Sequence, residues 1–132
     1  MATGDTVLSD DSLIRRPEGL GIALTVPWYR SLWLSSVSSI AVRVAGRVIP
    51  AADLRVELGD RTFRVEELPD QWDVLWFIQD RLVVVVPLEE PVAEGQELDV
   101  EATVELRLPY MQIAPMTYVT NHATSRRSLA AR

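Results

Sequence analysis

Three reactive side chains are scarce or missing in this sequence. It contains no cysteine and no lysine, and its single histidine is His122. Without cysteine the chain has neither disulfide bonds nor a thiolate metal site, and without lysine it cannot form a Schiff base. All 13 basic residues are therefore arginines. The sequence thus lacks many of the groups that usually act as acid, base or nucleophile.

Positive charge is also in short supply. Against the 13 arginines stand 19 acidic residues, which gives a formal net charge of −6 for 132 residues. An acidic chain without a basic stripe is poorly suited to binding phosphate backbones. We therefore expect no nucleic-acid partner.

Long hydrophobic runs are absent as well. The longest one, from Leu82 to Leu88, is far shorter than the roughly 20 residues that a membrane helix needs. The first residues, MATGDTVLSDDS, are acidic and lack the apolar centre of a signal peptide. We expect no membrane segment and a cytoplasmic location.

What the sequence does contain is strand periodicity. Between Leu20 and Val26 every second residue is large and apolar, so these residues share one face of a strand. Apolar and polar side chains alternate over the longer stretch from Leu98 to Leu108. The pairs Ala45-Gly46 and Gly59-Asp60 predict the turns of two hairpins. The β-branched tract from Arg81 to Pro87 predicts a strand that is buried on both faces.

No stretch shows a helical stripe of useful length, and the length of the chain suggests one domain. We predict an all-β fold, a single-domain antiparallel β-sandwich over residues 1–132 with its core at about 7–113. Residues 114–132 are rich in Ser, Thr and Arg and by themselves resemble a disordered segment. They are predicted to form an extended C-terminal tail that docks on a partner.

The motifs of common catalytic sites are missing. The sequence has no GxSxG elbow, no glycine-rich phosphate loop and no spacing of metal ligands. His122 lies in the polar tail, and we interpret it as a solvated residue rather than a site residue. The acidic doublets lie at turns or strand ends, where solvated surface charge is expected. We predict no catalytic residue and no metal ligand in this chain.

Aromatic residues are the remaining candidates for function. The loop sequence PWYRSLW and a second group, Trp72, Trp76 and Phe77, concentrate Trp, Tyr, Phe and Arg. Trp, Tyr and Arg often anchor protein interfaces, although aromatic rings also stack on sugars. We predict a partner interface or substrate mouth made of Pro27, Trp28, Tyr29, Arg30, Trp33, Trp76, Tyr110 and Met111.

Two structural alternatives remain open for these residues. Trp72 and Phe77 would instead complete the core at an end of the sandwich. Arg30 would instead form an internal ion pair with Asp73 or Glu67 that holds the loop in place.

Four segments in this order resemble the small (beta) subunit of bacterial C-glycoside deglycosidases. They are VPWYRSLWLSSVSSIAVRVAGRVIP, LRVELGDRTFRVEEL, QWDVLWFIQDRLVVVV and VEATVELRLPYM, and the resemblance runs from about Leu20 to Met111. Trp28 stands where this family often has tyrosine, and SLW replaces its usual GIP.

The resemblance implies a β-sandwich subunit of a hetero-oligomeric lyase. Its partner would be an alpha subunit with a TIM barrel like that of sugar-phosphate isomerases. That partner would hold a divalent metal, expected to be manganese, and the acid/base histidines, and this chain would hold no cofactor. The pair would cleave the C–C bond between a 3-oxo sugar and an aromatic aglycone such as a flavonoid, by deprotonation and elimination. Pro27 to Trp33 would then face the alpha subunit.

Two other functions stay open on the residues alone. One is a stand-alone β-sandwich that binds a carbohydrate or an aglycone. The other is a purely structural assembly protein, to which a ligand would make no difference.

Overall fold

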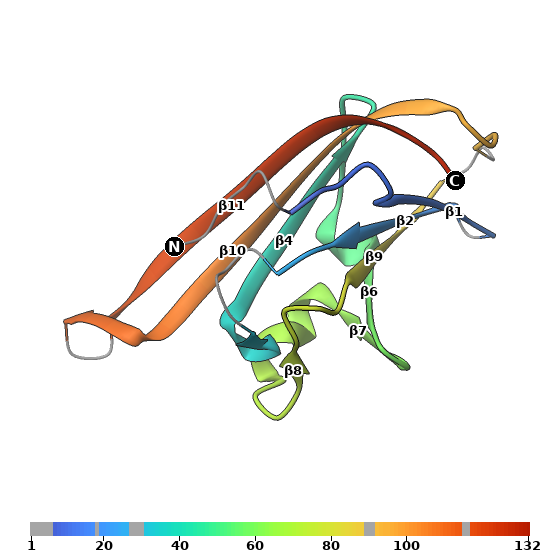
Figure 1. Cartoon of the computed structure of the whole chain (residues 1–132). Helices are drawn as coiled ribbons and strands as arrows, with labels where there is room; N and C mark the ends of the chain where they lie inside the picture. Colours follow the sequence, from blue (N-terminus) through green and yellow to red (C-terminus); the bar gives the residue numbers. More distant parts are fainter. Residues whose placement is uncertain (1–6, 18, 27–30, 89–91, 115–116) are drawn as a thin grey trace.

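The computed structural model describes residues 7–17, 19–26, 31–88, 92–114 and 117–132, and of residues 108–122 only the backbone. Almost all regular structure in these ranges is β (Figure 1). The strands are β1 (Leu13–Arg16), β2 (Gly19–Leu24), β3 (Leu32–Trp33), β4 (Val37–Val44), β5 (Arg47–Ile49), β6 (Arg55–Leu58), β7 (Arg61–Arg64), β8 (Leu75–Trp76), β9 (Leu82–Pro87), β10 (Glu97–Ala114) and β11 (Thr117–Ala130). Three short 3-10 turns connect them, namely η2 (Leu34–Ser36), η3 (Ala51–Asp53) and η4 (Val65–Asp70).

The strands form two main antiparallel sheets and a small third one. The first has the order β1-β2-β9-β6-β7, the second β11-β10-β4-β5, and β3 pairs only with β8. Apolar side chains from the inner faces of both main sheets form one buried cluster, so the sheets pack as a sandwich. The predicted all-β sandwich is confirmed.

The local predictions for turns are confirmed too, and the one for a strand buried on both faces is confirmed in part. Ala45 and Gly46 have φ of 52° and 78°, as a two-residue hairpin turn requires. Strand β9 lies between β2 and β6 in the first sheet. Its Val84 and Val85 point to opposite faces and are 0% and 7% exposed. On the face of Val85, however, Val83 is only partly buried and Pro87 is exposed, so the second face is covered only in part.

Strand β10 has the single wet face that its alternation predicts. Val100, Ala102, Val104 and Leu106 are fully buried, and the polar residues between them are on the outer side. This strand pairs with β4 on one side and β11 on the other. It is therefore one of the two inner strands of the second sheet.

The C-terminal residues differ from the extended tail expected from composition. They form β11, which pairs with β10 from Glu97↔Ala130 to Leu108↔Val119. Ala123 and Leu129 of β11 are 2% and 3% exposed and complete the core. The inner side of β11, beside β10, has small residues and only a few apolar ones. The composition of this strand therefore resembles that of a loop. A contact with a partner stays a prediction.

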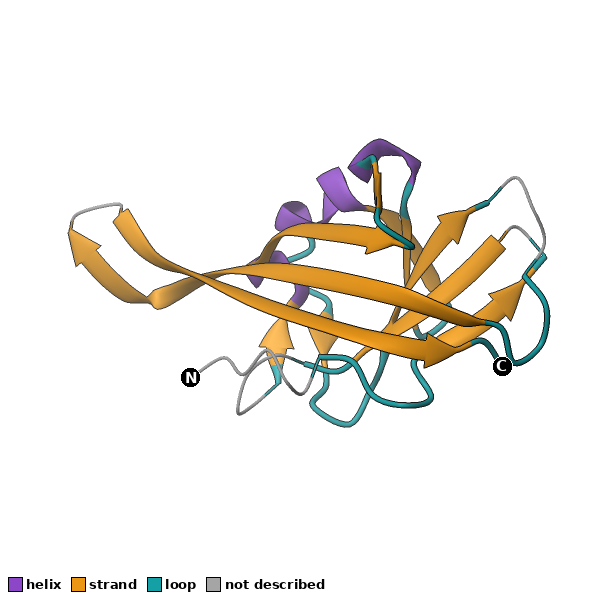
Figure 2. Cartoon of the chain, turned by 90° about the horizontal axis from the view of Figure 1, so that it is seen from above, coloured by secondary structure: helices purple, strands orange, loops and turns teal. Residues whose placement is uncertain are grey.

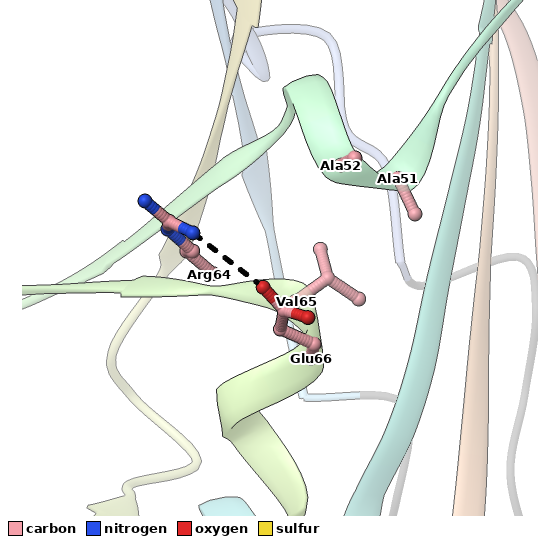
Figure 3. A pocket seen from close by; sticks show the side chains of 5 residues that line it. All are labelled: Ala51, Ala52, Arg64, Val65 and Glu66. Carbon is pink, nitrogen blue, oxygen red and sulfur yellow. Dashed lines mark ion pairs between the residues drawn. The ribbon is translucent and has the colours of Figure 1, made fainter.

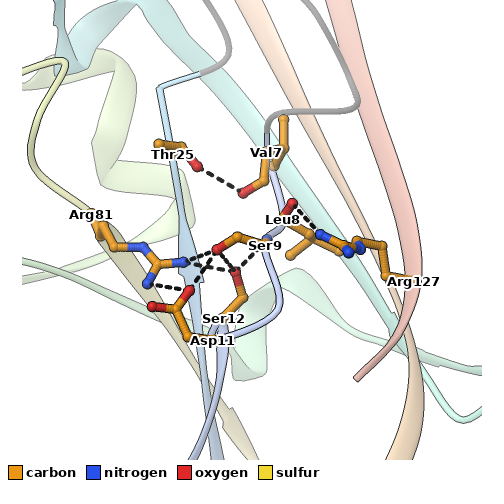
Figure 4. Close-up of polar contacts among 8 residues, drawn as sticks. All are labelled: Val7, Leu8, Ser9, Asp11, Ser12, Thr25, Arg81 and Arg127. Carbon is orange, nitrogen blue, oxygen red and sulfur yellow. Dashed lines mark hydrogen bonds and ion pairs between the residues drawn. The ribbon is translucent and has the colours of Figure 1, made fainter. Parts of the chain in front are cut away.

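A polar cluster attaches residues 7–12 to the body of the sandwich (Figure 4). The Arg81 guanidinium donates to the hydroxyls of Ser9 and Ser12 at 2.6 and 2.9 Å, and it lies 3.0 Å from the Asp11 carboxylate. The Ser9 hydroxyl also donates to Asp11, at 2.7 Å. One arginine thus holds three side chains of this segment.

In the parts of the chain given above, no helix has the length and apolar character needed to cross a bilayer.

Candidate functional site

Most large apolar side chains that the described residues expose lie in one region. Trp33, Trp72, Phe77 and Ile78 are 52%, 73%, 55% and 44% exposed, and the only other member of this class among described residues is Val48. We call these four side chains the aromatic surface. Water-exposed aromatic groups gathered in this way are typical of a binding surface rather than of an inert one.

The aromatic surface rests on the pairing of β3 with β8. In this two-stranded ladder Trp33 is opposite Leu75, and Leu32 is opposite Trp76. Paired residues point to the same side of a ladder, so Trp33 and Leu75 face outward while Leu32 and Trp76 face the core. This alternation accounts for the exposure of Trp33.

Hydrogen bonds on both sides of this ladder hold residues 31–35 and residues 71–78 together. The Leu34 amide donates to the Val74 carbonyl at 2.7 Å, and the Ser35 amide donates to the Gln71 carbonyl at 3.1 Å. At the other end the Ile78 amide donates to the Ser31 hydroxyl at 2.8 Å. Residues 31–35 and 71–78 thus form one ordered platform for the exposed rings.

Trp76 does not belong to the exposed set, so its prediction as an interface residue is wrong. Its side chain is fully buried, and its Nε1–H donates to the Asp80 carbonyl at 3.0 Å. The reason is its place in the ladder, because it is opposite the buried Leu32. Trp76 is the inner support of the aromatic surface.

The predicted site does not include Trp72, Phe77 or Ile78, and for the first two the sequence analysis offers a place in the core. The structure exposes all three. Polar neighbours at Gln71, Asp73, Gln79 and Asp80 were the sequence signal for this exposure. Large aromatic residues hide that signal because they are usually counted as core residues.

Most of the other predicted site residues lie outside what the structure describes. This holds for Pro27, Trp28, Tyr29 and Arg30, and for the side chains of Tyr110 and Met111 in β10. The alternative pairing of Arg30 with Glu67 or Asp73 stays untested for the same reason. The Glu67 carboxylate accepts a hydrogen bond from the Arg64 amide at 2.8 Å and caps the start of η4.

The described residues offer little chemistry of their own. Nowhere among them do three His, Asp or Glu side chains meet in a way that could hold a metal ion. A hollow between η3 and η4 is lined by Ala51, Ala52, Arg64, Val65 and Glu66 (Figure 3). Its Arg64–Glu66 ion pair is 3.7 Å long and solvent-exposed. This hollow contains no arrangement of acid, base and nucleophile.

The carboxyl groups with displaced pKa values belong to surface ion pairs. Hydrogen bonds from the Ser9 hydroxyl and the charge of Arg81 hold the pKa of Asp11 below its usual value. A hydrogen bond from Arg126 does the same for the pKa of Asp99. Both groups are stabilised as anions, which is the opposite of a carboxyl prepared to donate a proton.

A family model and individual proteins that match this chain are all described as deglycosidase beta subunits. Residues 11–110 match the model of a family described as C-glycoside deglycosidase beta subunit. A protein of that description from Arthrobacter globiformis is 46% identical over 129 residues, which are 98% of either chain. A 3'-dehydrocarminate deglycosidase beta subunit from a Microbacterium species is 30% identical over 110 residues, which are 83% of this chain and 82% of that protein.

Proposed function

Because the chain belongs to the C-glycoside deglycosidase beta-subunit family, we propose that it binds an alpha subunit through the aromatic surface. The observation that supports this role is the exposure of Trp33, Trp72, Phe77 and Ile78 on a platform ordered by β3 and β8. The three aromatic side chains of this set bury much area for little loss of conformational freedom, which suits them as interface anchors. The hetero-oligomer so formed would be the active deglycosidase.

The predicted loop residues extend this surface along the chain. Pro27 to Arg30 precede Ser31, whose hydroxyl is tied to the Ile78 amide. In our proposal Arg30 pairs with a carboxylate of the alpha subunit, and Trp28 and Tyr29 border the aglycone or fill a pocket of the partner. Tyr110 and Met111 belong to the same proposed contact region.

The catalytic groups are assigned to the alpha subunit in this proposal. The described residues of the beta chain bring no three metal-ligating side chains together, so they do not fit a divalent metal. A TIM-barrel alpha subunit would hold the metal, with manganese as our first candidate, together with the histidines that transfer protons. A cytoplasmic location stays a prediction.

The proposed reaction is a C–C bond cleavage by elimination from a 3-oxo-C-glycoside. The 3-oxo group acidifies the C2 proton of the sugar, and a base of the alpha subunit removes it. The electron pair then forms the C1=C2 double bond while the bond from C1 to the aromatic carbon breaks. That ring carbon takes up a proton, so no oxidant or reductant is required. The relative named for a 3'-dehydro glycoside supports this substrate class, and flavonoids are our first candidate aglycones.

The test combines binding and activity with matched variants. The beta chain and the alpha subunit are co-expressed, co-purified and assayed on a 3-oxo-C-glycoside, as wild type and as Trp33→Ala, Phe77→Ala and Val48→Ala. Val48 is the control because it is 61% exposed but lies on β5, at the other end of β4. We expect Trp33→Ala to weaken binding by about 2–4 kcal/mol and Val48→Ala to leave it unchanged.

Other outcomes would reject the proposal. If no complex forms and the beta chain alone binds a glycoside, a stand-alone carbohydrate- or aglycone-binding module is the better description. If the complex forms but the Trp33 and Phe77 variants bind like wild type, the interface lies elsewhere. If alpha is fully active without the beta chain, the role in the deglycosidase is wrong.

A further inference from the structure

Strands β10 and β11 continue beyond the body of the sandwich as a two-stranded ribbon. Strand β4 pairs with β10 only as far as Leu106↔Val37, whereas β10 runs on to Ala114 with β11 beside it. Figures 1 and 2 show this ribbon extending past the other strands. We call residues 107–114 and 117–122 the arm. The strand from Leu108 to Ala114 gives it a reach of about 20 Å.

The arm and the aromatic surface lie at the same end of the sandwich. Since β10 runs antiparallel to β4, its extension passes the beginning of β4 at Val37. Trp33 and η2 directly precede Val37 in the chain. The root of the arm is tied to this end by Ser38, whose hydroxyl lies 2.9 Å from the Glu105 carboxylate and 3.2 Å from the Glu105 carbonyl oxygen.

The sequence of the arm is unusual for a ribbon in water. The 14 residues LPYMQIAPMTYVTN, from Leu108 to Asn121, include no Asp, Glu or Arg. The chain as a whole has 32 such residues, 13 basic and 19 acidic, among 132. A two-stranded ribbon is at best marginally stable alone, and a free strand edge is normally protected by charge. An uncharged ribbon of this kind is typical of a segment that a partner covers.

We propose that the arm docks on the alpha subunit, alongside the aromatic surface, so that one partner is held by two separate elements. This inference rests on the proposed function, because it names the same partner. The match to the Arthrobacter globiformis beta subunit covers 98% of both chains and therefore extends into the arm, while the family model ends at residue 110. Most of the arm thus lies beyond the part that the family model spans but within the reach of the match to that relative.

A second copy of the chain is the competing occupant. Among the described residues, β11 has no neighbouring strand on its outer edge. Pairing of that edge with a second copy would not by itself cover the aromatic surface. A single alpha subunit in contact with both elements would cover both. The alpha subunit is therefore the occupant that accounts for the placement of the arm.

The experiment shortens the arm and measures binding of purified alpha subunit by calorimetry. Residues 109–118 are replaced by Asn-Gly, which joins Leu108 to Val119, residues that the register pairs. Asn-Gly suits a two-residue hairpin, and the contacts of β10 and β11 within the sandwich are retained. Full-length Trp33→Ala and Val48→Ala chains are measured beside it, and light scattering gives the mass of each beta chain alone.

We expect the shortened chain to bind the alpha subunit at least about tenfold more weakly. Its oligomeric state and its thermal midpoint should equal those of wild type. Wild-type affinity in the shortened chain, with weak binding by Trp33→Ala, would overturn the arm inference and exclude Tyr110 and Met111 from the contact region. The proposed binding of the alpha subunit through the aromatic surface would still stand. An unchanged affinity with loss of a dimer would show that the arm pairs two copies, and would also overturn it. Failure of the wild-type chain to bind alpha would reject both proposals.

A point variant keeps the inference testable if the shortened chain does not fold. Tyr118→Asp adds a charge to the arm without changing the length of either strand. The same tenfold loss of affinity is expected, and wild-type affinity in a folded Tyr118→Asp chain would count against docking of the arm.

Discussion

Arg16 on β1 and Glu57 on β6 form a bidentate ion pair across two intervening strands. Its two N–H···O distances are 3.0 and 2.8 Å, and β2 and β9 lie between the two strands in the sheet. The arginine stem passes over Gly21, where a Cβ would lie 3.3 Å from Arg16 Cγ and 3.1 Å from Val83 Cγ1. Glycine thus leaves room for a side chain that ties one edge strand to the far half of the sheet.

Replacing Arg16 by methionine is expected to lower the free energy of unfolding by about 1–2 kcal/mol, because it leaves the half-buried Glu57 carboxylate without this partner. Urea unfolding measures the change. The matched control is Arg126→Met, which breaks the more exposed pair with Asp99 and should lower the free energy of unfolding much less, because solvent screens an exposed pair. Equal effects of the two variants would contradict the structural role of the Arg16 pair.

Gly19→Ala is expected to destabilise the fold more than Gly46→Ala. Gly19 has φ of +149°, and an added Cβ would lie 2.2 Å from the Val86 carbonyl oxygen, which is backbone and cannot move aside. Strain and overpacking together suggest a loss of about 2–5 kcal/mol. Gly46 has φ of +78° but open space around it, so alanine there should cost about 1–2 kcal/mol. Thermal unfolding of both variants compares them directly.

Trp76 should contribute to stability and Trp72 should not. Trp76→Ala opens a cavity in the core, so we expect a loss of about 3–5 kcal/mol in the free energy of unfolding. Trp76→Phe keeps most of the volume but loses the hydrogen bond to Asp80, for a loss of about 1–2 kcal/mol. Trp72→Ala, at an exposed position, is the control and should change stability by less than about 0.5 kcal/mol. A mild Trp76→Ala variant would show that this side chain is not a core residue.

The Asp11 contacts should stabilise the fold only while this carboxyl is ionised. The Ser9 hydroxyl and then Arg81 lower its folded pKa below the usual 3.8. A lowered pKa means that the contribution is fully present well above pH 3.8 and is lost as the pH falls through the folded value. Asp11→Asn should therefore be less stable than wild type at pH 7, with a smaller difference at pH 3. Urea midpoints at both pH values measure this, and a difference that grows in acid would contradict it.

The periodic patterns predicted most of the sandwich because they report local rules. Alternation over Leu98–Leu108 reflects one buried face, and the glycine turns reflect backbone angles that few other residues adopt. The unbroken β-branched run predicts strand β9, of which one face is fully buried and the other only in part. These features depend on neighbouring residues along the chain, so they can be read without the fold.

The pairing of β11 and the burial of Trp76 depend on residues distant in sequence. Leu129 is buried because β11 lies against β10. No local sequence pattern predicts that β10 is the strand with which β11 pairs. Trp76 is buried because the ladder with β3 places it opposite the buried Leu32, whereas Phe77 follows the end of that ladder and is exposed. The sequence instead predicts Trp76 at the interface and offers the core as the alternative for Phe77, so only the fold assigns these two aromatic residues.

The sequence alone determined the all-β class, the hairpins and the resemblance to the family. It could do so because turn chemistry, alternation and residue inventory are properties of short segments. Only the tertiary structure decided which aromatic rings reach the surface, how the C-terminal residues complete the second sheet, and that the arm emerges beside Trp33. Those outcomes depend on which strands meet and in what register, and that is set by packing between segments far apart in the chain.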